Sequence, residues 1–195
     1  MILAVDKASP YRDIQTVFLD RDGVLNRKAE EGEYVSRWDV FHPLPGIEKA
    51  LRLLNEAKLP VYVVTNQRGV ALGLYTASDV ERLHARLLEE LRSHGAHVEG
   101  FFFCPHDKGV CSCRKPKAGL FEQARALHPE IDFSTSVMIG DSLTDIEAGD
   151  RLGMQTILIE GKSEPHRAGD AKARSTSGAV SESLLDAAEL LLGVS

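Results

Sequence analysis

Short apolar runs alternate along this chain with longer segments in which apolar residues recur at helical spacing. The short runs, rich in Val, Ile and Phe, predict strands at 16–20, 60–66, 100–103, 136–141 and 155–160. The longer segments predict helices at 45–59, 78–91, 118–127, 144–153 and 180–192. Because strands that alternate with helices are joined by right-handed crossovers, the pattern predicts a mostly parallel central sheet.

These elements fit one α/β domain over residues 1–195, which we expect to be a Rossmann-like three-layer sandwich. Within it we expect the core at about 14–160, a mobile polar loop at about 161–178 and a C-terminal helix at about 180–192. Ser78 and Glu81 have the spacing of a capping box for the second helix. The segment from Gly23 to Leu44 is too short for a large cap domain, so we expect an open site.

The composition narrows the class of protein. A hydrophobic content of 43% with 27% charged residues is typical of a soluble globular domain. The net charge of -6 argues against a nucleic-acid or membrane-surface binder, which needs a basic face. Residues 1–13 lack the long apolar core of a signal peptide, and the three cysteines are an odd number for a secreted disulfide framework. We therefore expect a cytoplasmic protein, and a monomer because nothing marks an interface.

Acidic and hydroxyl side chains follow neighbouring strands where each strand ends. Asp20 and Asp22 end the first strand, Thr65 lies at the tip of the second, and Asp141 and Asp145 follow the fourth. Each could simply cap a turn or helix, and for Asp145 that explanation is as good as a functional one. Converging carboxylates repel each other unless a cation binds, and an all-oxygen donor set favours Mg²⁺.

Such a site suits phosphoryl transfer. A magnesium ion held by Asp20 and Asp141 would neutralise a phosphate brought against Asp20, whose carboxylate could attack phosphorus. Asp22 could protonate the leaving alkoxide and later deprotonate the hydrolytic water. A Lys or Arg is then needed to balance the phosphoryl oxygens in the transition state.

The motifs DRDGVLN, TNQ, RKP and GDSLTD occur in this order between Thr16 and Ile159, which is most of the chain. The ordered set resembles the four motifs of the haloacid dehalogenase (HAD) superfamily of phosphatases. The resemblance implies these roles: Asp20 as nucleophile, Asp22 as general acid/base, Thr65 and Lys115 as phosphoryl-binding groups, Asp141 as the Mg²⁺ ligand beside Asp20 and the Asp22 carbonyl, and Asp145 as a supporting acid.

All three cysteines lie in the stretch CPHDKGVCSCRKPKAG at 104–119. Cys104, His106, Cys111 and Cys113 offer four thiolate or imidazole ligands, the set that a structural zinc ion takes tetrahedrally. A disulfide would leave one thiol over, and inert free thiols remain the simpler alternative. A zinc ion here would stiffen the loop and fix where Arg114 and Lys115 begin.

A DRDG start, TNQ and a C-x-H…C-x-C-R-K-P loop also resemble a narrower group, the D-glycero-D-manno-heptose 1,7-bisphosphate 7-phosphatases and the histidinol-phosphate phosphatases. That resemblance places these residues near the substrate: Asn26, Tyr34, Val35, Asn66, Gln67 and Arg114. Arg68, directly after TNQ, and Lys28 could supply further cations for a distal phosphate. It implies removal of the 7-phosphate through an aspartyl-phosphate, in nucleotide-activated heptose biosynthesis.

Three departures from the group keep the substrate open. The zinc loop is short, Ser142 follows the metal aspartate where some heptose enzymes have lysine, and residues 27–33 are expanded. Histidinol phosphate, with a cationic amine in place of the second phosphate, is the alternative substrate, and another small phosphosugar is a third. Two alternatives are not enzymes: a phosphorylated signalling receiver, and a zinc-dependent binding module that has lost catalysis. The intact acid/base Asp22 argues against the receiver, and the full set of catalytic groups argues against the binding module.

Overall fold

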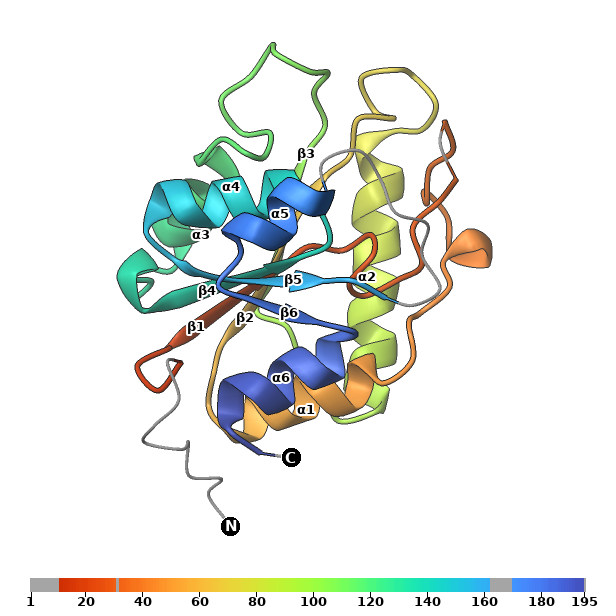
Figure 1. Ribbon diagram of the computed structural model, residues 1–195. Helices are drawn as coiled ribbons and strands as arrows, with labels where there is room; N and C mark the ends of the chain where they lie inside the picture. The colour runs from red at the N-terminus through yellow and green to blue at the C-terminus, as the bar shows by residue number, and fades with distance from the viewer. Residues whose placement is uncertain (1–10, 31, 162–169, 195) are drawn as a thin grey trace.

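The computed structural model describes residues 11–30, 32–161 and 170–194. Its centre is a six-stranded sheet in the order β3-β2-β1-β4-β5-β6, with every neighbouring pair parallel (Figure 1). The strands are β1 (Thr16–Leu19), β2 (Val61–Asn66), β3 (Gly100–Cys104), β4 (Ser136–Gly140), β5 (Gln155–Ile159) and β6 (Ala179–Ser181). The expected parallel α/β sheet is confirmed, with β6 added at one edge.

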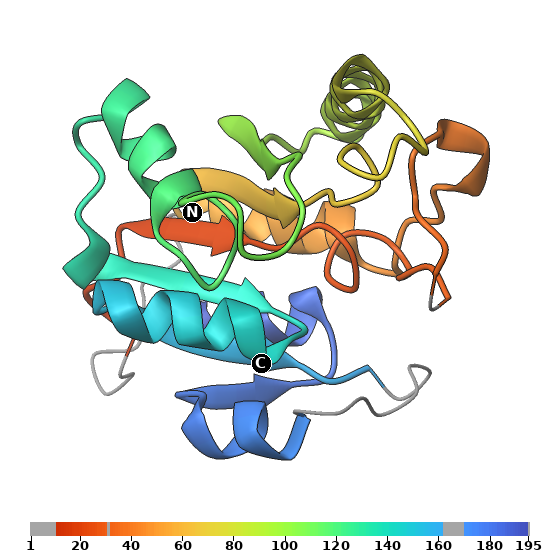
Figure 2. The ribbon, with the colours of Figure 1, turned by 90° about the horizontal axis from the view of Figure 1, so that it is seen from above.

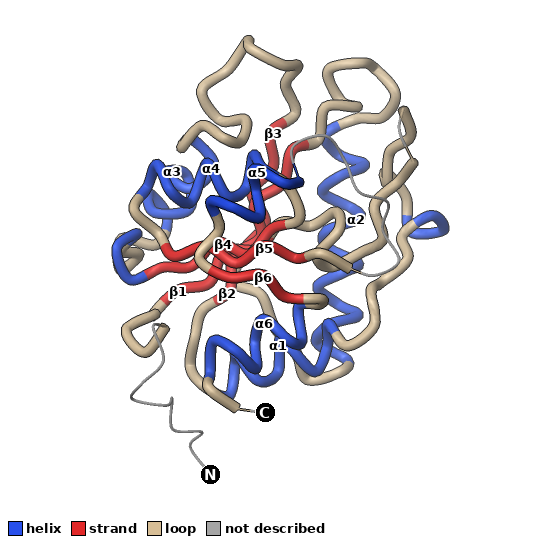
Figure 3. Tube along the Cα trace, in the orientation of Figure 1, coloured by secondary structure: helices blue, strands red, loops and turns tan. Residues whose placement is uncertain are grey.

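Helices cover both faces of the sheet (Figures 1 and 3). They are α1 (Ile47–Glu56), α2 (Ala77–Ser93), α3 (Gly119–Leu127), α4 (Leu143–Leu152), α5 (Asp170–Thr176) and α6 (Leu184–Leu192), with the 3-10 turns η1 (Trp38–Val40) and η2 (Phe133–Thr135). Within β1, Val17 and Leu19 join the core under α1, α2 and α6, whereas Phe18 packs with Phe121 of α3 on the other face. The period-2 alternation of a strand buried on both sides therefore produces the three layers that we predicted.

The sequence predictions miss several element boundaries. Helix α1 is shorter at both ends than the predicted 45–59, and α6 begins at Leu184 rather than near 180 because β6 takes up Ala179–Ser181. Helix α2 begins at Ala77, one residue earlier than predicted, and its N-cap lies two residues earlier, because Thr76 and Asp79 form the capping box that we assigned to Ser78 and Glu81. In the predicted loop 161–178, residues 170–178 instead hold α5 and the approach to β6. Residues 162–169 of that loop, and 1–10 of the N-terminal stretch, lie outside the described residues.

The strand order puts β1 between β2 and β4, so the chain leaves β1 for one side and later returns to the other. The carboxyl ends of these three strands point to the same side of the sheet (Figure 2), where the loops after β1 and β2 also lie. Ligands of open α/β sheets bind at such a switch point.

The segment between β1 and α1 is a loop over the switch point. In its described residues, η1 is the one helical turn, and no cap domain folds there. Throughout 11–30, 32–161 and 170–194, every helix is too short or too polar to cross a lipid bilayer.

Candidate active site

Three predicted residues meet at the switch point. Asp20 follows β1, Thr65 lies near the end of β2, and Asp141 follows β4. The Asp20 amide donates to Ile139 O (2.9 Å), which continues the β1–β4 ladder and fixes where the Asp20 side chain leaves the backbone. Asp20 and Thr65 are buried among apolar strand residues. The sheet register therefore brings together groups that are far apart in the sequence.

Carboxylates crowd this edge. Ligand oxygens of Asp20, Asp141 and Asp145 all lie within 4.8 Å of one another. Burial raises the pKa of Asp20 to about 7, although the Lys115 charge opposes the shift and the Asp145 and Asp141 charges add to it. Burial also raises the pKa of Asp141 to about 6, against the opposing charge of Lys28. Oxygen donors held this close, at this electrostatic cost, fit a hard divalent cation such as Mg²⁺.

Gly23 makes room for one of these carboxylates. A Cβ built on Gly23 would fall 2.0 Å from Asp141 Oδ2, and its φ of +92° is a conformation that glycine adopts without strain. The turn after β1 thus wraps directly onto Asp141. The Asp22 side chain is outside the carboxylate group, so its predicted contribution through the backbone carbonyl stays a prediction.

Asp145 is fully buried, and both of its oxygens have protein partners. Oδ2 accepts from the Ser142 amide (3.1 Å) and hydroxyl (2.6 Å), which completes the capping box of α4. Oδ1 lies 2.6 Å from Lys115 Nζ. Gly140 faces this side chain so closely that a Cβ would lie 2.2 Å from Asp145 Cβ. This geometry agrees with a supporting group whose oxygens are occupied by the protein.

Lys115 is the buried cation of the site. Its Nζ contacts Asp20 Oδ1 (2.9 Å), Asp145 Oδ1 (2.6 Å) and Val64 O (2.7 Å). Burial lowers the pKa of Lys115, but the Asp145 and Asp20 charges outweigh burial, and the net shift is upward. The amine therefore stays charged beside Asp20, where a phosphoryl oxygen would arrive.

Asp22 is held by side-chain donors. It accepts from Asn26 Nδ2 (2.9 Å), from Gln67 Nε2 (2.9 Å) and from the guanidinium of Arg21 (3.0 Å). Burial alone would raise the pKa of Asp22, but the Arg21 charge and these hydrogen bonds lower it below its ordinary value. Arg21 was missed in the sequence, where it was only the spacer of the DRDG motif.

A cavity of about 530 Å³ opens above these groups. Its lining includes the predicted residues Asp20, Asp22, Tyr34, Val35, Thr65, Asn66, Gln67, Arg68, Arg114 and Lys115. Asn26 is absent from the lining, because it is fully buried beneath Asp22. The structure places Asn26 against the acid/base candidate rather than on the cavity wall, so its predicted contact with substrate stays a prediction.

The cavity wall is rich in cations, since Lys28, Arg68, Lys108 and Arg114 all line it. Lys28 Nζ contacts both oxygens of Asp141 (2.5 and 2.8 Å), and Arg68 pairs with Asp107 at 2.5 Å. Nη1 of Arg114 is buried without a hydrogen-bond partner among the described residues. These cations share the cavity lining with the acids Asp20, Asp22, Glu30 and Glu33, in a protein whose net charge is -6.

The four predicted zinc ligands also come together. Cys104 Sγ lies 3.6 Å from Cys111 Sγ and 3.3 Å from Cys113 Sγ, and His106 Nδ1 lies 3.2 Å from Cys113 Sγ. These separations exclude a disulfide among the three free thiols. They are close to the edge of about 3.7 Å of a tetrahedron built on zinc–sulfur bonds of about 2.3 Å. The donor set therefore fits a structural zinc ion.

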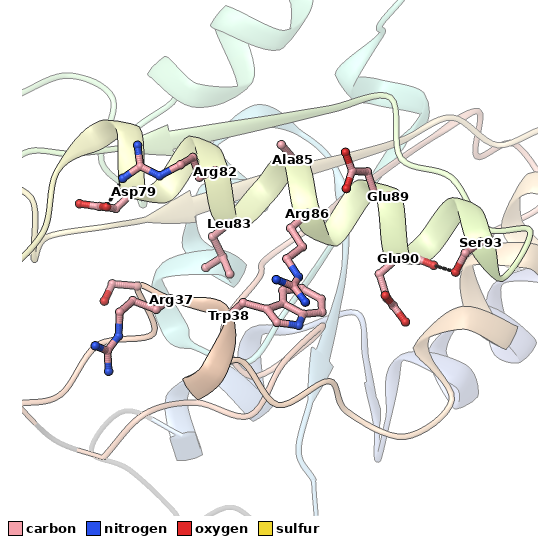
Figure 4. Close-up of a pocket in the computed structure, with 11 residues that line it drawn as sticks. Arg37, Trp38, Asp79, Arg82, Leu83, Ala85, Arg86, Glu89, Glu90 and Ser93 are labelled. Atoms are coloured by element: carbon pink, nitrogen blue, oxygen red, sulfur yellow. Dashed lines mark hydrogen bonds and ion pairs between the residues drawn. The ribbon is translucent and has the colours of Figure 1, made fainter.

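A larger groove of about 720 Å³ lies elsewhere, between η1 and α2 (Figure 4). Its centre is Trp38, with the Arg86 guanidinium 4.8 Å from the ring centroid. Its arginines (Arg37, Arg82, Arg86) are matched by acids (Asp79, Glu89, Glu90), and no strand-end residue lines it. Size alone does not make it the active site.

Known proteins resemble the chain over most of its length. Residues 112–187 match the HAD-hydrolase-like family model. The D-glycero-alpha-D-manno-heptose-1,7-bisphosphate 7-phosphatase of Mycobacterium tuberculosis is 44% identical over 132 residues, which are 67% of this chain and 69% of that protein. The beta-heptose enzyme of Pseudomonas aeruginosa is 38% identical over 146 residues, covering 74% and 80%.

A solved structure gives the same result. The D,D-heptose 1,7-bisphosphate phosphatase from B. bronchiseptica, crystallised with magnesium and phosphate, superposes with a TM-score of 0.78 at 30% identity. The alignment covers 92% of this chain and 99% of that one. The chain therefore belongs to the HAD superfamily of phosphatases, in the family that contains the heptose-1,7-bisphosphate 7-phosphatases.

Proposed function

We propose that this protein is a Mg²⁺-dependent phosphomonoesterase that removes the 7-phosphate of D-glycero-D-manno-heptose 1,7-bisphosphate. The observation that carries the proposal is the position of Asp20, whose carboxylate lies 2.9 Å from Lys115 Nζ at the floor of a cation-lined cavity. An ionised carboxylate beside a fixed cation is equipped to attack phosphorus while the cation takes up charge on the phosphoryl oxygens.

In the first step an Asp20 oxygen forms a bond to phosphorus, and the bond from phosphorus to the sugar oxygen breaks. Asp22 gives its proton to the departing sugar oxygen, which leaves as an alcohol. Asp22 is ionised in the free site, and the negative charge of the incoming phosphate favours the protonated form that it then donates from. The product bound to the enzyme is an aspartyl-phosphate on Asp20.

In the second step a water molecule attacks phosphorus, and Asp22 accepts the proton that water loses. The bond from phosphorus to Asp20 breaks, so inorganic phosphate and the original carboxylate are formed. Thr65 lines the same cavity as the two aspartates, and its hydroxyl, which accepts from Gln67 Nε2 (3.0 Å), is available to bind a phosphoryl oxygen.

Asp20 and Asp141, with the carbonyl of Asp22, are the residues that would hold Mg²⁺, which neutralises charge on the attacking carboxylate and on the phosphoryl oxygens. The short contacts of Lys28 and Lys115 with these aspartates show how strongly their carboxylates attract positive charge. The relative crystallised with magnesium supports the same choice of ion.

The zinc loop would act as a brace rather than as a catalyst. Arg114 and Lys115 directly follow Cys113. The Asn66 side chain makes two hydrogen bonds with the Lys115 backbone: its Nδ2 donates to Lys115 O (3.2 Å), and its Oδ1 accepts from the Lys115 amide (3.0 Å). Asn66, predicted to hold substrate, is thus also a link between the end of β2 and the zinc loop.

The cationic wall favours a substrate with a second phosphate over histidinol phosphate, whose amine would face Lys28, Arg68, Lys108 and Arg114. Glu30 and Glu33 also line the cavity and are the groups that could accept an amine. Among anomers we propose the α form, since relatives of that specificity are 44% identical and those named for the β form are 33–38% identical.

The test is a comparison of kcat/KM for the α and β heptose bisphosphates and for histidinol phosphate. We expect the order α, then β, then histidinol phosphate. A higher value for histidinol phosphate would overturn the substrate, and a higher value for the β anomer would overturn the anomer alone. The monomeric state and the cytoplasmic location expected from the sequence stay predictions.

A further inference from the structure

His84 lies behind Asp22, the acid/base candidate. It is not one of the cavity cations or the candidate metal ligands described above. His84 sits on the buried face of α2, stacked on the Phe101 ring at 4.5 Å with an angle of 19°. Its Nε2 lies 3.2 Å from Nη1 of Arg21. No local sequence pattern predicts this contact, because the two residues are 63 positions apart in the chain.

Arg21 is fully buried and has a partner for each of its three guanidinium nitrogens. Nε and Nη2 donate to the Asp22 carboxylate (3.0 Å for each oxygen from Nη2), and Nη2 also donates to Val35 O at 2.9 Å. The remaining nitrogen, Nη1, donates to His84. Because a guanidinium only donates, His84 must present an unprotonated Nε2 and carry its proton on Nδ1.

This arrangement fixes the plane of the guanidinium at its far end. A planar fork can hold a carboxylate in one orientation only while the fork itself cannot rotate. On the opposite side, Gln67 donates to Asp22 and accepts from the Tyr75 hydroxyl at 2.9 Å. Asp22 is therefore held between two supported donors, one anchored by His84 and one by Tyr75.

We infer that His84 is a positioning residue, which seats Arg21 so that the Asp22 carboxylate faces the oxygen of the leaving group. The inference rests on the proposed phosphatase mechanism. Proton transfer in the first step needs Asp22 within hydrogen-bonding distance and correctly aligned, and small misplacements are costly. A histidine that only filled space between α2 and β3 would have no such effect on one particular step.

A pair of variants distinguishes a role of His84 in positioning Arg21 from a role in merely filling the space between α2 and β3. His84→Phe keeps a flat ring against Phe101 but removes the acceptor for Arg21, whereas His84→Gln restores an acceptor with a different shape. The substrates are heptose bisphosphate, whose alkoxide must be protonated to leave, and p-nitrophenyl phosphate, whose phenolate leaves without a proton. The parameter is kcat/KM, which covers the steps up to release of the leaving group.

We expect His84→Phe to lower kcat/KM about 10- to 100-fold for heptose bisphosphate and less than about threefold for the aryl ester. His84→Gln should recover most of the loss. Equal losses on both substrates, or a Gln variant as poor as Phe, would overturn the inference. His94→Phe, an exposed histidine at the end of the same helix, is the control for placing a ring on α2.

A double-mutant cycle with Asp22→Asn gives a second measurement that needs only the sugar substrate. If His84 acts through Asp22, His84→Phe has no further effect once Asp22 is Asn, whereas additive losses would refute that path. Circular dichroism and thermal melts establish that each variant is folded. A wild-type enzyme inactive on all phosphate esters would instead refute the proposed function itself.

Discussion

Gly23 touches the Asp141 carboxylate so closely that no other residue fits between the turn after β1 and the end of β4. The contact joins the acid/base turn to the metal candidate that lies more than a hundred residues later in the chain. It makes the Asp141 oxygens part of one rigid unit with Asp20 and Asp22. This relationship is open to a direct test.

We predict that Gly23→Ala loses Mg²⁺-dependent activity by about 100-fold or more, because a misplacement of about 1 Å at a reacting centre has that effect. The added methyl group must displace Asp141 or unwind the turn. Gly73→Ala is the matched control, since Gly73 also has a positive φ (+70°) but nothing within 4 Å of its Cβ position. Both variants share the backbone strain, so equal activity losses would refute a specific role of the Gly23 contact.

Asp20→Asn should abolish hydrolysis and leave the fold intact, because the amide neither attacks phosphorus nor disturbs the packing. Activity assays and a thermal melt check the two parts. Substantial residual turnover would rule out Asp20 as the nucleophile. Glu48→Gln, a change at a half-buried residue in the first turn of α1, serves as a control for the loss of one negative charge.

The raised pKa of Asp20 predicts that the effect of Asp20→Asn on the stability of the fold depends on pH. Asp20 has a folded-state pKa of about 7 against an ordinary value of 3.8, so its ionised form destabilises the metal-free fold. The destabilisation is absent below about pH 4 and grows as the pH rises towards 7. In EDTA, Asp20→Asn should therefore raise the melting temperature by several degrees more at pH 8 than at pH 5. An equal effect at both pH values would contradict the raised pKa.

Lys28 Nζ lies 2.5 Å from Oδ2 of Asp141, a residue proposed to hold Mg²⁺. A divalent ion bound by Asp141 must displace this amine, so Lys28→Met should bind Mg²⁺ about tenfold more tightly, which corresponds to about 1.4 kcal/mol. Calorimetric titration of the metal alone measures the change. Lys108→Met, which lines the same cavity without contacting Asp141, should leave the affinity unchanged. A weaker affinity in Lys28→Met would contradict the competition.

Removal of zinc should loosen substrate binding before it stops the chemistry, because the brace positions Arg114 and Lys115. With Mg²⁺ present, we expect a zinc-selective chelator to raise KM about tenfold at first, with kcat falling later. Steady-state kinetics with metal analysis by mass spectrometry follow both quantities. Unchanged KM and kcat in a zinc-free enzyme would refute the brace. Val110→Ser, on the exposed tip of the same loop, should behave like wild type.

The parts of the site that follow strands were predictable, since apolar runs locate strands and parallel topology places their ends together. Asp20, Thr65 and Asp141 needed only this rule, and the cysteine cluster needed only ligand chemistry. The start of α2 was ambiguous because Thr76 and Ser78 are each followed three residues later by an acid, and packing chose the earlier pair.

Other features depend on contacts that no local pattern encodes. β6 is three residues long at the edge of the sheet, and β5 stabilises it from one side only. Arg21 is flanked by two acids in the sequence, and only the fold shows that it turns inward to His84 and Val35. The position of Asn26 was also not predictable from the sequence. The turn after β1 sets the direction of its side chain, which points to Asp22.

The positions of these residues, at strand ends or in loops, suggest a way to change the substrate preference of the enzyme. Asp20, Asp22, Thr65 and Asp141 lie at or directly after the ends of β1, β2 and β4, whereas Lys28, Arg68, Lys108 and Arg114 come from the loops beyond them. Apart from Lys115, which follows Arg114 in the zinc loop, the residues for bond breaking and those for selectivity therefore lie in separate segments of the chain. Grafting segments 27–35 and 105–114 from a relative, with the zinc ligands kept, should exchange substrate preference while the turnover machinery stays whole.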